Sequence, residues 1–192
     1  MTPIQTTVVV VVVIAALIVI GLTVMSQRSR TLRKRFGPEY DKVLADQDSR
    51  TGAEHELRAR ERRHAELELR PLSPESRSRY ATDWTNIQAR FVDVPKTAVT
   101  EADKLVTELI AECGYPTTDY ADQLATLSVE HATTLQHYRD AHEINLKNER
   151  GVASTEELRQ ALVHYRALFS DLLGENPVPT PERSSRSDSQ QP

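Results

Sequence analysis

The chain has 192 residues, of which 39% are hydrophobic and 27% are charged, and its formal net charge is −4. Its single cysteine and six glycines exclude a disulfide-stapled scaffold, a cysteine-rich zinc module and a collagen-like repeat. These averages are those of an ordinary soluble domain, but neither the charged nor the apolar residues are spread evenly along the chain.

The first feature along the chain is an apolar stretch of 18 residues, 8–25, without a charged side chain. As a helix with a rise of about 1.5 Å per residue it would be roughly 27 Å long, close to the thickness of the hydrocarbon core of a bilayer. The six consecutive valines at 8–13 leave no polar face, which disfavours a buried core helix of a soluble domain. We therefore predict a transmembrane helix over 8–25.

The residues on either side of this stretch predict its orientation. Residues 1–7 carry no charged side chain, and there is neither a basic region before the stretch nor a small-residue cleavage site after it, which disfavours a signal peptide. Five basic residues follow the stretch closely, and basic residues mark the cytoplasmic side. They are Arg28, Arg30, Arg33, Lys34 and Arg35. We predict one uncleaved span, with residues 1–7 as an extracytoplasmic tip and the C-terminal part in the cytoplasm.

The same five basic residues have a second interpretation. Clusters of basic residues next to a span also bind anionic lipid headgroups, at about 1 kcal/mol for each Lys or Arg. The orientation of the span is sufficient to explain them, so lipid binding remains the less favoured interpretation.

Residues 26–70 are predicted to form this basic flank and a charged helical stalk. A short helix is expected near Tyr40 to Leu44. Segment 54–70 holds five glutamates and five arginines, some of them spaced i,i+4 as ion pairs on a helix are, for example Glu54 and Arg58. Its three leucines are too sparse for a coiled-coil seam. We therefore expect a solvated helix that separates the span from the body of the protein.

Residues 71–174 predict an all-α fold, a compact bundle of about five helices. Ser73 and Pro74 are typical of a helix start, and an apolar stripe follows at helical spacing. It consists of Tyr80, Trp84, Ile87 and Phe91. Ser154 and Glu157 have the spacing of a capping box at the start of the last helix. The expected limits of the other four helices are Asp93 to Gly114, Thr117 or Thr118 to about Leu127, Glu130 to Arg150, and Ser154 to Gly174.

The charge of this segment bears on its partners. Residues 71–174 contain sixteen acidic and ten basic residues, a net charge of −6. This argues against nucleic acid as a ligand, because neutralisation of phosphates dominates such binding. The remaining segment, 175–192, is rich in proline and serine and is predicted to be disordered.

No established catalytic or metal-binding motif occurs in the sequence, and we predict no cofactor, no metal and no enzymatic activity. Cys113 is expected at the C-terminal end of a helix, where the helix dipole opposes a thiolate, so it is expected to be buried or inert.

One repeated tripeptide stands out, since His-Tyr-Arg occurs in each of the last two expected helices. If the two helices are neighbours, two histidines and two arginines could form a small anion-binding or partner-binding site. These residues are His137, Arg139, His164 and Arg166. The simpler interpretation, which we favour, is that the two tyrosines are core residues and that the flanking side chains lie at the rim.

Four runs of sequence resemble a family of small single-pass membrane proteins of high-GC Gram-positive bacteria. The runs are RPLSPESRSRYATDWTNIQARFVD, EADKLVTELIAECGYP, LQHYRDAHEI and STEELRQALVHYRALFSDLL. The resemblance covers roughly residues 30–173 and implies an architecture with one N-terminal span, but no particular activity, ligand or site. Members of the family are often called secreted proteins, whereas the basic residues after the span favour a cytoplasmic body.

The sequence thus predicts a membrane-anchored helical interaction module, an adaptor or regulatory protein. Its expected partners are the lipid bilayer and another protein, and not nucleic acid. The alternative is a small-molecule or anion sensor, or an enzyme, that uses the two His-Tyr-Arg segments. Convergence of His137, Arg139, His164 and Arg166 around a cavity would favour this alternative.

Overall fold

A computed structural model of the chain describes residues 29–47 and 49–174 and the isolated positions 16, 19, 23 and 27. All regular structure in these residues is helical, which confirms the predicted all-α class. Within them, no helix combines the length and the apolar character that crossing a bilayer requires. The predicted transmembrane helix falls outside the described residues except at three positions, and the predicted disordered tail falls outside them entirely.

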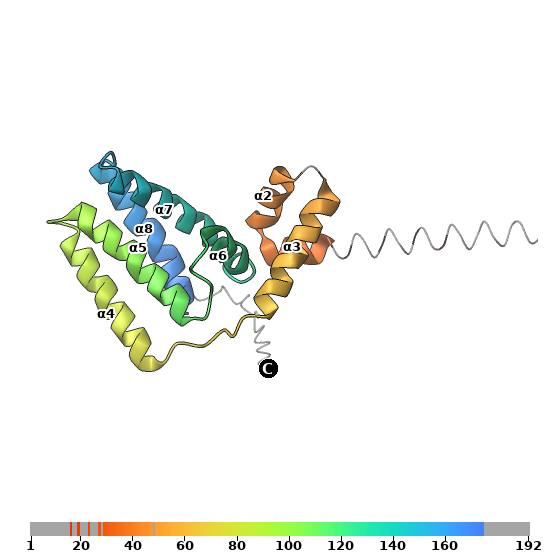
Figure 1. The fold of residues 1–192 in the computed structure, drawn as a ribbon, viewed down its shortest axis with the longest axis horizontal. Coiled ribbons are helices and arrows are strands. Elements are labelled where there is room, and N and C mark those ends of the chain that lie inside the picture. Colours follow the sequence, from red (N-terminus) through yellow and green to blue (C-terminus); the bar gives the residue numbers. More distant parts are fainter. Residues whose placement is uncertain are drawn as a thin grey trace, which may run out of the picture.

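Seven helices have both ends within the described residues, and they form two groups (Figure 1). The first group is α2 (Pro38–Asp46) and α3 (Arg50–Ala65), preceded by helical residues 29–36. The second group is the predicted bundle of five helices: α4 (Pro74–Arg90), α5 (Pro95–Glu112), α6 (Tyr120–Leu127), α7 (Leu135–Glu149) and α8 (Thr155–Leu172).

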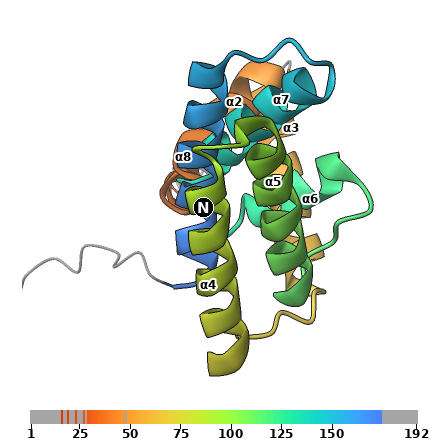
Figure 2. The same ribbon diagram turned by 90° about the vertical axis from the view of Figure 1, so that its left-hand side faces the viewer.

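The core of the bundle lies between α5, α7 and α8, with α4 packed against α5 at one edge (Figures 1 and 2). The predicted stripe of α4 faces this core, and its Trp84 stacks on Phe169 of α8 with ring centroids 4.7 Å apart. Tyr138 and Tyr165, the tyrosines of the repeated tripeptide, are fully buried and meet edge to face at 6.1 Å. The prediction that they are core residues is therefore confirmed.

The two helix starts predicted from a serine cap, at Ser73 and Ser154, are present in the structure. The Ser73 side chain accepts from the Ser76 N–H, and Ser154 and Glu157 form the complete capping box. The third helix differs, because Asp119 rather than Thr117 or Thr118 caps α6. In the second helix of the bundle, α5, Val94 rather than Asp93 occupies the N-cap position.

The fourth helix of the bundle also begins later than predicted. The sequence predicts a start at Glu130, but residues 128–134 form turns and α7 begins at Leu135. These turns carry Val129 out of the bundle and into the hydrophobic cluster of α2 and α3. Leu127 and Leu135 on either side of these turns lie in the core of the bundle, so this connection contributes to both hydrophobic clusters.

Substitution of Ser154 tests the capping box. Ser154→Ala is expected to lower the free energy of unfolding by about 1 kcal/mol, because it leaves the Glu157 N–H in the first turn of α8 without its acceptor. Urea denaturation measures this loss. Ser78→Ala, at an exposed serine inside α4, is the matched control and is expected to cost nothing. Equal losses for the two variants would show that the capping box does not stabilise α8.

The segment expected to be a solvated stalk instead has a core of its own, which corrects the sequence-based interpretation. Ala53 and Leu57 of α3 are fully buried against apolar residues of the preceding helices. This second hydrophobic cluster consists of Leu32, Phe36, Tyr40, Val43, Ala53, Leu57 and Val129. The interpretation is wrong because the residues that bury α3, above all Phe36 and Tyr40, lie before it in the chain and not within it.

The connection from α3 to α4 is fixed to the end of α5. The Arg70 N–H donates to the Cys113 carbonyl at 3.0 Å, and the backbone of Glu68 lies directly over Gly114. Since α3 also packs against α6, the two groups of helices form one continuous structure (Figure 1).

Candidate functional site

The structure brings the two histidines of the repeated tripeptide together. The helices α7 and α8 are neighbours, and His137 Nδ1 lies 2.8 Å from His164 Nδ1, with the two rings stacked at 5.0 Å. One ring must donate and the other must accept in this contact, so it does not form when both rings are protonated.

The two arginines of the tripeptides do not join this histidine pair. Arg139 turns towards α2 and binds Glu39 there, and Arg166 is exposed on α8. The four predicted residues therefore do not surround a common site, and two of them make a direct contact.

The contact of Arg139 with Glu39 is the main polar link between the two groups of helices. Glu39 is only 2% exposed, and both of its carboxylate oxygens accept from the Arg139 guanidinium, one of them at 2.8 Å. Arg60 of α3 adds a second cation 3.9 Å from Glu39. Three helices, α2, α3 and α7, therefore meet at one buried carboxylate, which we call the Glu39 junction.

Local geometry favours a carboxylate at this position. Glu39 follows Pro38 in the first turn of α2, where the positive end of the helix dipole stabilises an anion. Arg60 is held in place by Glu56 at 3.0 Å and by Ser128 Oγ at 3.5 Å. Nothing in the sequence near Glu39 points to a partner 100 residues away, so the junction could not be predicted.

A second polar feature is a cavity of about 380 Å³ beneath the connection between α3 and α4. One of its lining residues, His131, is paired with a carboxylate outside the lining, since His131 Nδ1 lies 2.8 Å from Asp171 Oδ2. Thr134 donates to the same oxygen at 2.7 Å. The lining residues are Leu69, Arg70, Pro71, Cys113, Tyr115, Glu130, His131 and Leu172. No sequence motif singles out this cavity, because its residues come from four separate segments.

The groups around this cavity are not arranged for attack by a thiolate. Burial raises the pKa of Cys113 to about 11, and the negative charge of Glu112 adds to the effect. Burial likewise raises the pKa of Tyr115, whose hydroxyl donates to Glu130 at 3.3 Å. Cys113 is buried, as predicted. The Cys113 thiol and the Tyr115 hydroxyl are both protonated at neutral pH, so the cavity offers hydrogen bonds rather than a nucleophile.

The hydrogen bonds that Asp171 accepts bear on the stability of the fold. Burial alone would raise the pKa of Asp171, but hydrogen bonds from His131 and Thr134 outweigh it, and the pKa is lowered. A lowered carboxyl pKa stabilises the folded state above the unfolded pKa of about 3.9, and this stabilisation is lost as the pH falls through the folded pKa.

Asp171→Asn should therefore be less stable than the wild type at pH 7. The difference between the two should begin to shrink as the pH falls below about 4, where the unfolded chain takes up the proton, and should disappear below the lowered pKa of the folded carboxyl group. Urea denaturation at a series of pH values measures this. A constant difference between the two proteins from neutral to acidic pH would contradict the assignment.

The predicted basic flank is partly described. Arg28 lies outside the described residues, and Lys34 is exposed. Arg35 pairs with Glu61 at 3.3 Å on the surface. The other two flank residues, Arg30 and Arg33, line a cavity of about 320 Å³ between the helical residues 29–36, one side of α2 and the first residue of α3.

Within the described part of the chain, no three His, Cys, Asp or Glu side chains are grouped so that they could hold a metal ion. Comparison of the chain with protein-family models, with curated protein sequences and with solved structures finds no match. A function is therefore inferred from the chain's own residues and their geometry.

Proposed function

We propose that the chain is a membrane-anchored interaction protein, an adaptor or regulator, whose helical bundle is held at a fixed position beside the membrane. The Glu39 junction is the observation that carries this proposal. It ties the helices that directly follow the basic flank to α7 of the bundle through a buried ion pair.

The distance along the chain between the predicted span and the folded part is short. Leu32, the first residue of the second hydrophobic cluster, is seven residues after Met25, where the predicted span ends. A flexible stalk would let the bundle sample many orientations, whereas helices packed this close to the span would fix one orientation. Fixed presentation is useful to an adaptor, because less orientational freedom is lost when a partner binds.

The end of the bundle opposite α2 and α3 offers a surface for such a partner (Figures 1 and 2). The α4–α5 and α7–α8 loops lie there, and beside them Asn148 in the last turn of α7 donates to the Lys96 carbonyl in the first turn of α5 at 2.8 Å. This end carries exposed aliphatic side chains: Val92, Val94, Leu146 and Val152. Since residues 71–174 have a net charge of −6, the partner that fits is a protein with apolar residues surrounded by basic ones.

Site-directed variants of the full chain test this proposal in membranes. Val92→Asp with Val152→Asp is expected to abolish chemical crosslinks to a discrete partner, and Val163→Asp, at an exposed valine within α8, is expected to retain them. Loss of the crosslinks in both variants, or in neither, would contradict the assignment of this end as the binding surface.

The alternative function, a sensor or enzyme built on the two tripeptides, has less support. His137 and His164 do meet, but Glu39 engages Arg139 and Arg166 is exposed elsewhere on α8. The cations that an anion would need are therefore missing from the histidine pair.

A further inference from the structure

We propose that the cavity beside the basic flank binds a phosphate group, and that this phosphate belongs to the headgroup of an anionic phospholipid. The inference rests on the proposed membrane anchoring and assigns a ligand to that part of the molecule. It interprets the flank as a shaped binding site rather than only as a signal for orientation.

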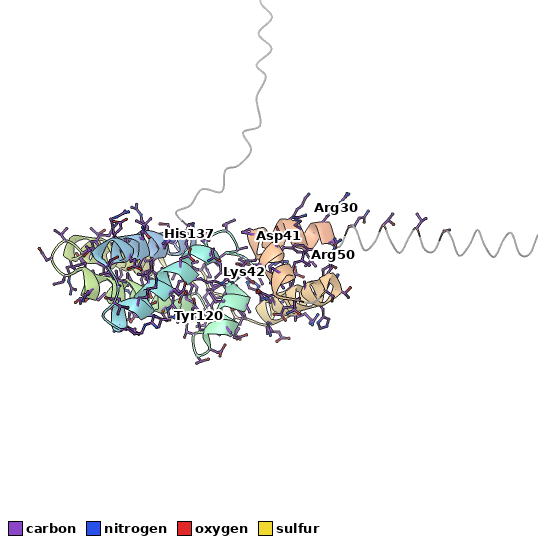
Figure 3. The ribbon with its side chains drawn as sticks, turned by 90° about the horizontal axis from the view of Figure 1, so that it is seen from above. Arg30, Asp41, Lys42, Arg50, Tyr120 and His137 are labelled. Carbon is purple, nitrogen blue, oxygen red and sulfur yellow. The ribbon has the colours of Figure 1, made fainter. Side chains whose placement is uncertain are left out.

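The lining of the cavity is predominantly cationic. Three guanidinium groups and one carboxylate surround a volume of about 320 Å³, together with a tyrosine, a serine and a leucine. The residues are Ser29, Arg30, Arg33, Tyr40, Asp41, Leu44 and Arg50. Figure 3 shows Arg30, Asp41 and Arg50 at the end of the molecule that α2 and α3 form.

A single partly buried carboxylate, 12% exposed, organises these walls. Glu54 of α3 accepts from Ser29 Oγ, from the Tyr40 hydroxyl at 3.4 Å and from Arg50 Nε at 3.2 Å. Ser29 and Tyr40 are themselves buried, so the back of the cavity is rigid while the arginines reach its mouth. This framework brings residues from three helical segments to one place.

The arginines keep donors available for an anion. Arg33 donates to Asp41 through one nitrogen, Nη2, at 3.1 Å, and Arg50 donates to Glu54 through Nε. A guanidinium has five N–H groups, and phosphate oxygens are its preferred two-point acceptors. A phosphate in the cavity would compete with Asp41 for Arg33, so Asp41 is expected to weaken binding.

The position of the cavity matches the depth of headgroups. Ser29 is four residues beyond Met25, or about 6 Å along a helix. The headgroup layer on each side of a bilayer is about 5–7 Å thick. With the predicted span in the hydrocarbon core, the mouth of the cavity lies among lipid phosphates, and this favours a lipid over a soluble phosphate as the source.

The test uses the full chain in micelles of an uncharged detergent. The chain is titrated with phosphatidylglycerol, with phosphatidylcholine or with soluble glycerol phosphate, and the bound complexes are counted by native mass spectrometry. Phosphatidylglycerol is expected to bind, and Arg33→Gln with Arg50→Gln is expected to weaken it roughly tenfold or more. Asp41→Asn is expected to strengthen it, because it removes the competing carboxylate.

Lys34→Gln with Arg62→Gln is the matched control, since it removes two exposed positive charges that do not line the cavity. It is expected to change binding by no more than about threefold. Equal weakening in the control would overturn the proposal, because binding would then depend on general charge alone. Binding of glycerol phosphate but not of the lipid would overturn the lipid assignment.

Failure of this test is distinguishable from failure of membrane anchoring. Anchoring is measured by cell fractionation of the wild-type chain, whereas the phosphate site is measured by the difference between two variants of equal charge. A chain that fractionates with membranes but shows no such difference would refute the site alone.

Discussion

Replacement of Glu39 by alanine is expected to lower the free energy of unfolding by about 3–5 kcal/mol. The substitution would leave Arg139 and Arg60 facing each other in a nearly closed environment, with side chains only 17% and 16% exposed and without their shared carboxylate. Most of the expected loss is the cost of a buried charge without a partner, since the complete pair offers little net stabilisation over an apolar replacement.

A double-mutant cycle separates these contributions. Glu39→Ala with Arg139→Ala is expected to be less destabilised than the sum of the two single variants, as determined by urea denaturation. Asp41→Ala is the control on the same helix. Its ion pair with Arg33 is 58% and 66% exposed, so its loss should cost less than about 1 kcal/mol. Additivity of the two junction variants would show that Glu39 and Arg139 do not stabilise each other.

Gly114→Ala is expected to be the second large effect, at roughly 2–4 kcal/mol. Gly114 has φ +96°, a backbone angle that residues with a side chain rarely adopt. A Cβ atom at this position would lie 2.5 Å from the Glu68 carbonyl oxygen. Backbone atoms cannot move aside as the end of a flexible side chain can. The connection between α3 and α4 would have to lift from the end of α5 and break its hydrogen bond from Arg70 to Cys113.

Gly151→Ala separates the effect of backbone strain at a positive φ from the effect of a steric clash with the new Cβ atom. Gly151 has φ +75°, but nothing lies within 4 Å of the position that an alanine Cβ would occupy, so only the strain of about 1–2 kcal/mol is expected. Thermal unfolding of both variants gives the comparison. If Gly114→Ala is no worse than Gly151→Ala, the connection over Gly114 is not held as the structure describes.

Features encoded by neighbouring residues could be predicted from the sequence. The cap at Ser73, the capping box at Ser154 and the stripe through Trp84 each depend on a few consecutive turns, and each is present in the structure. The all-α class follows from the same periodicity.

Features that join distant segments could not be predicted. Glu39 and Arg139 are 100 residues apart, and an isolated acidic residue after a proline is typical of any helix start. The same holds for His131 and Asp171, which lie in the turns before α7 and near the end of α8. The repeated tripeptide is informative in part, because it points to the His137 and His164 contact but also to two arginines that lie elsewhere.

For α3, the sequence predicts the helix correctly but its burial incorrectly. The glutamates and arginines of α3 predict a helix, but its buried apolar positions, Ala53 and Leu57, are too few to reveal an inner face. Partners from residues 29–43 complete that face. Burial of a small helix therefore depends on apolar residues outside it, which a helix-by-helix interpretation of the sequence does not weigh.

Protease protection of the full chain in intact cells tests the proposed anchoring most directly. A tag after residue 192 should fractionate with membranes, resist an alkaline carbonate wash and survive protease added outside the cell. Recovery of the tagged chain in the soluble fraction, or digestion of the tag from outside, would contradict a cytoplasmic bundle held beside the membrane.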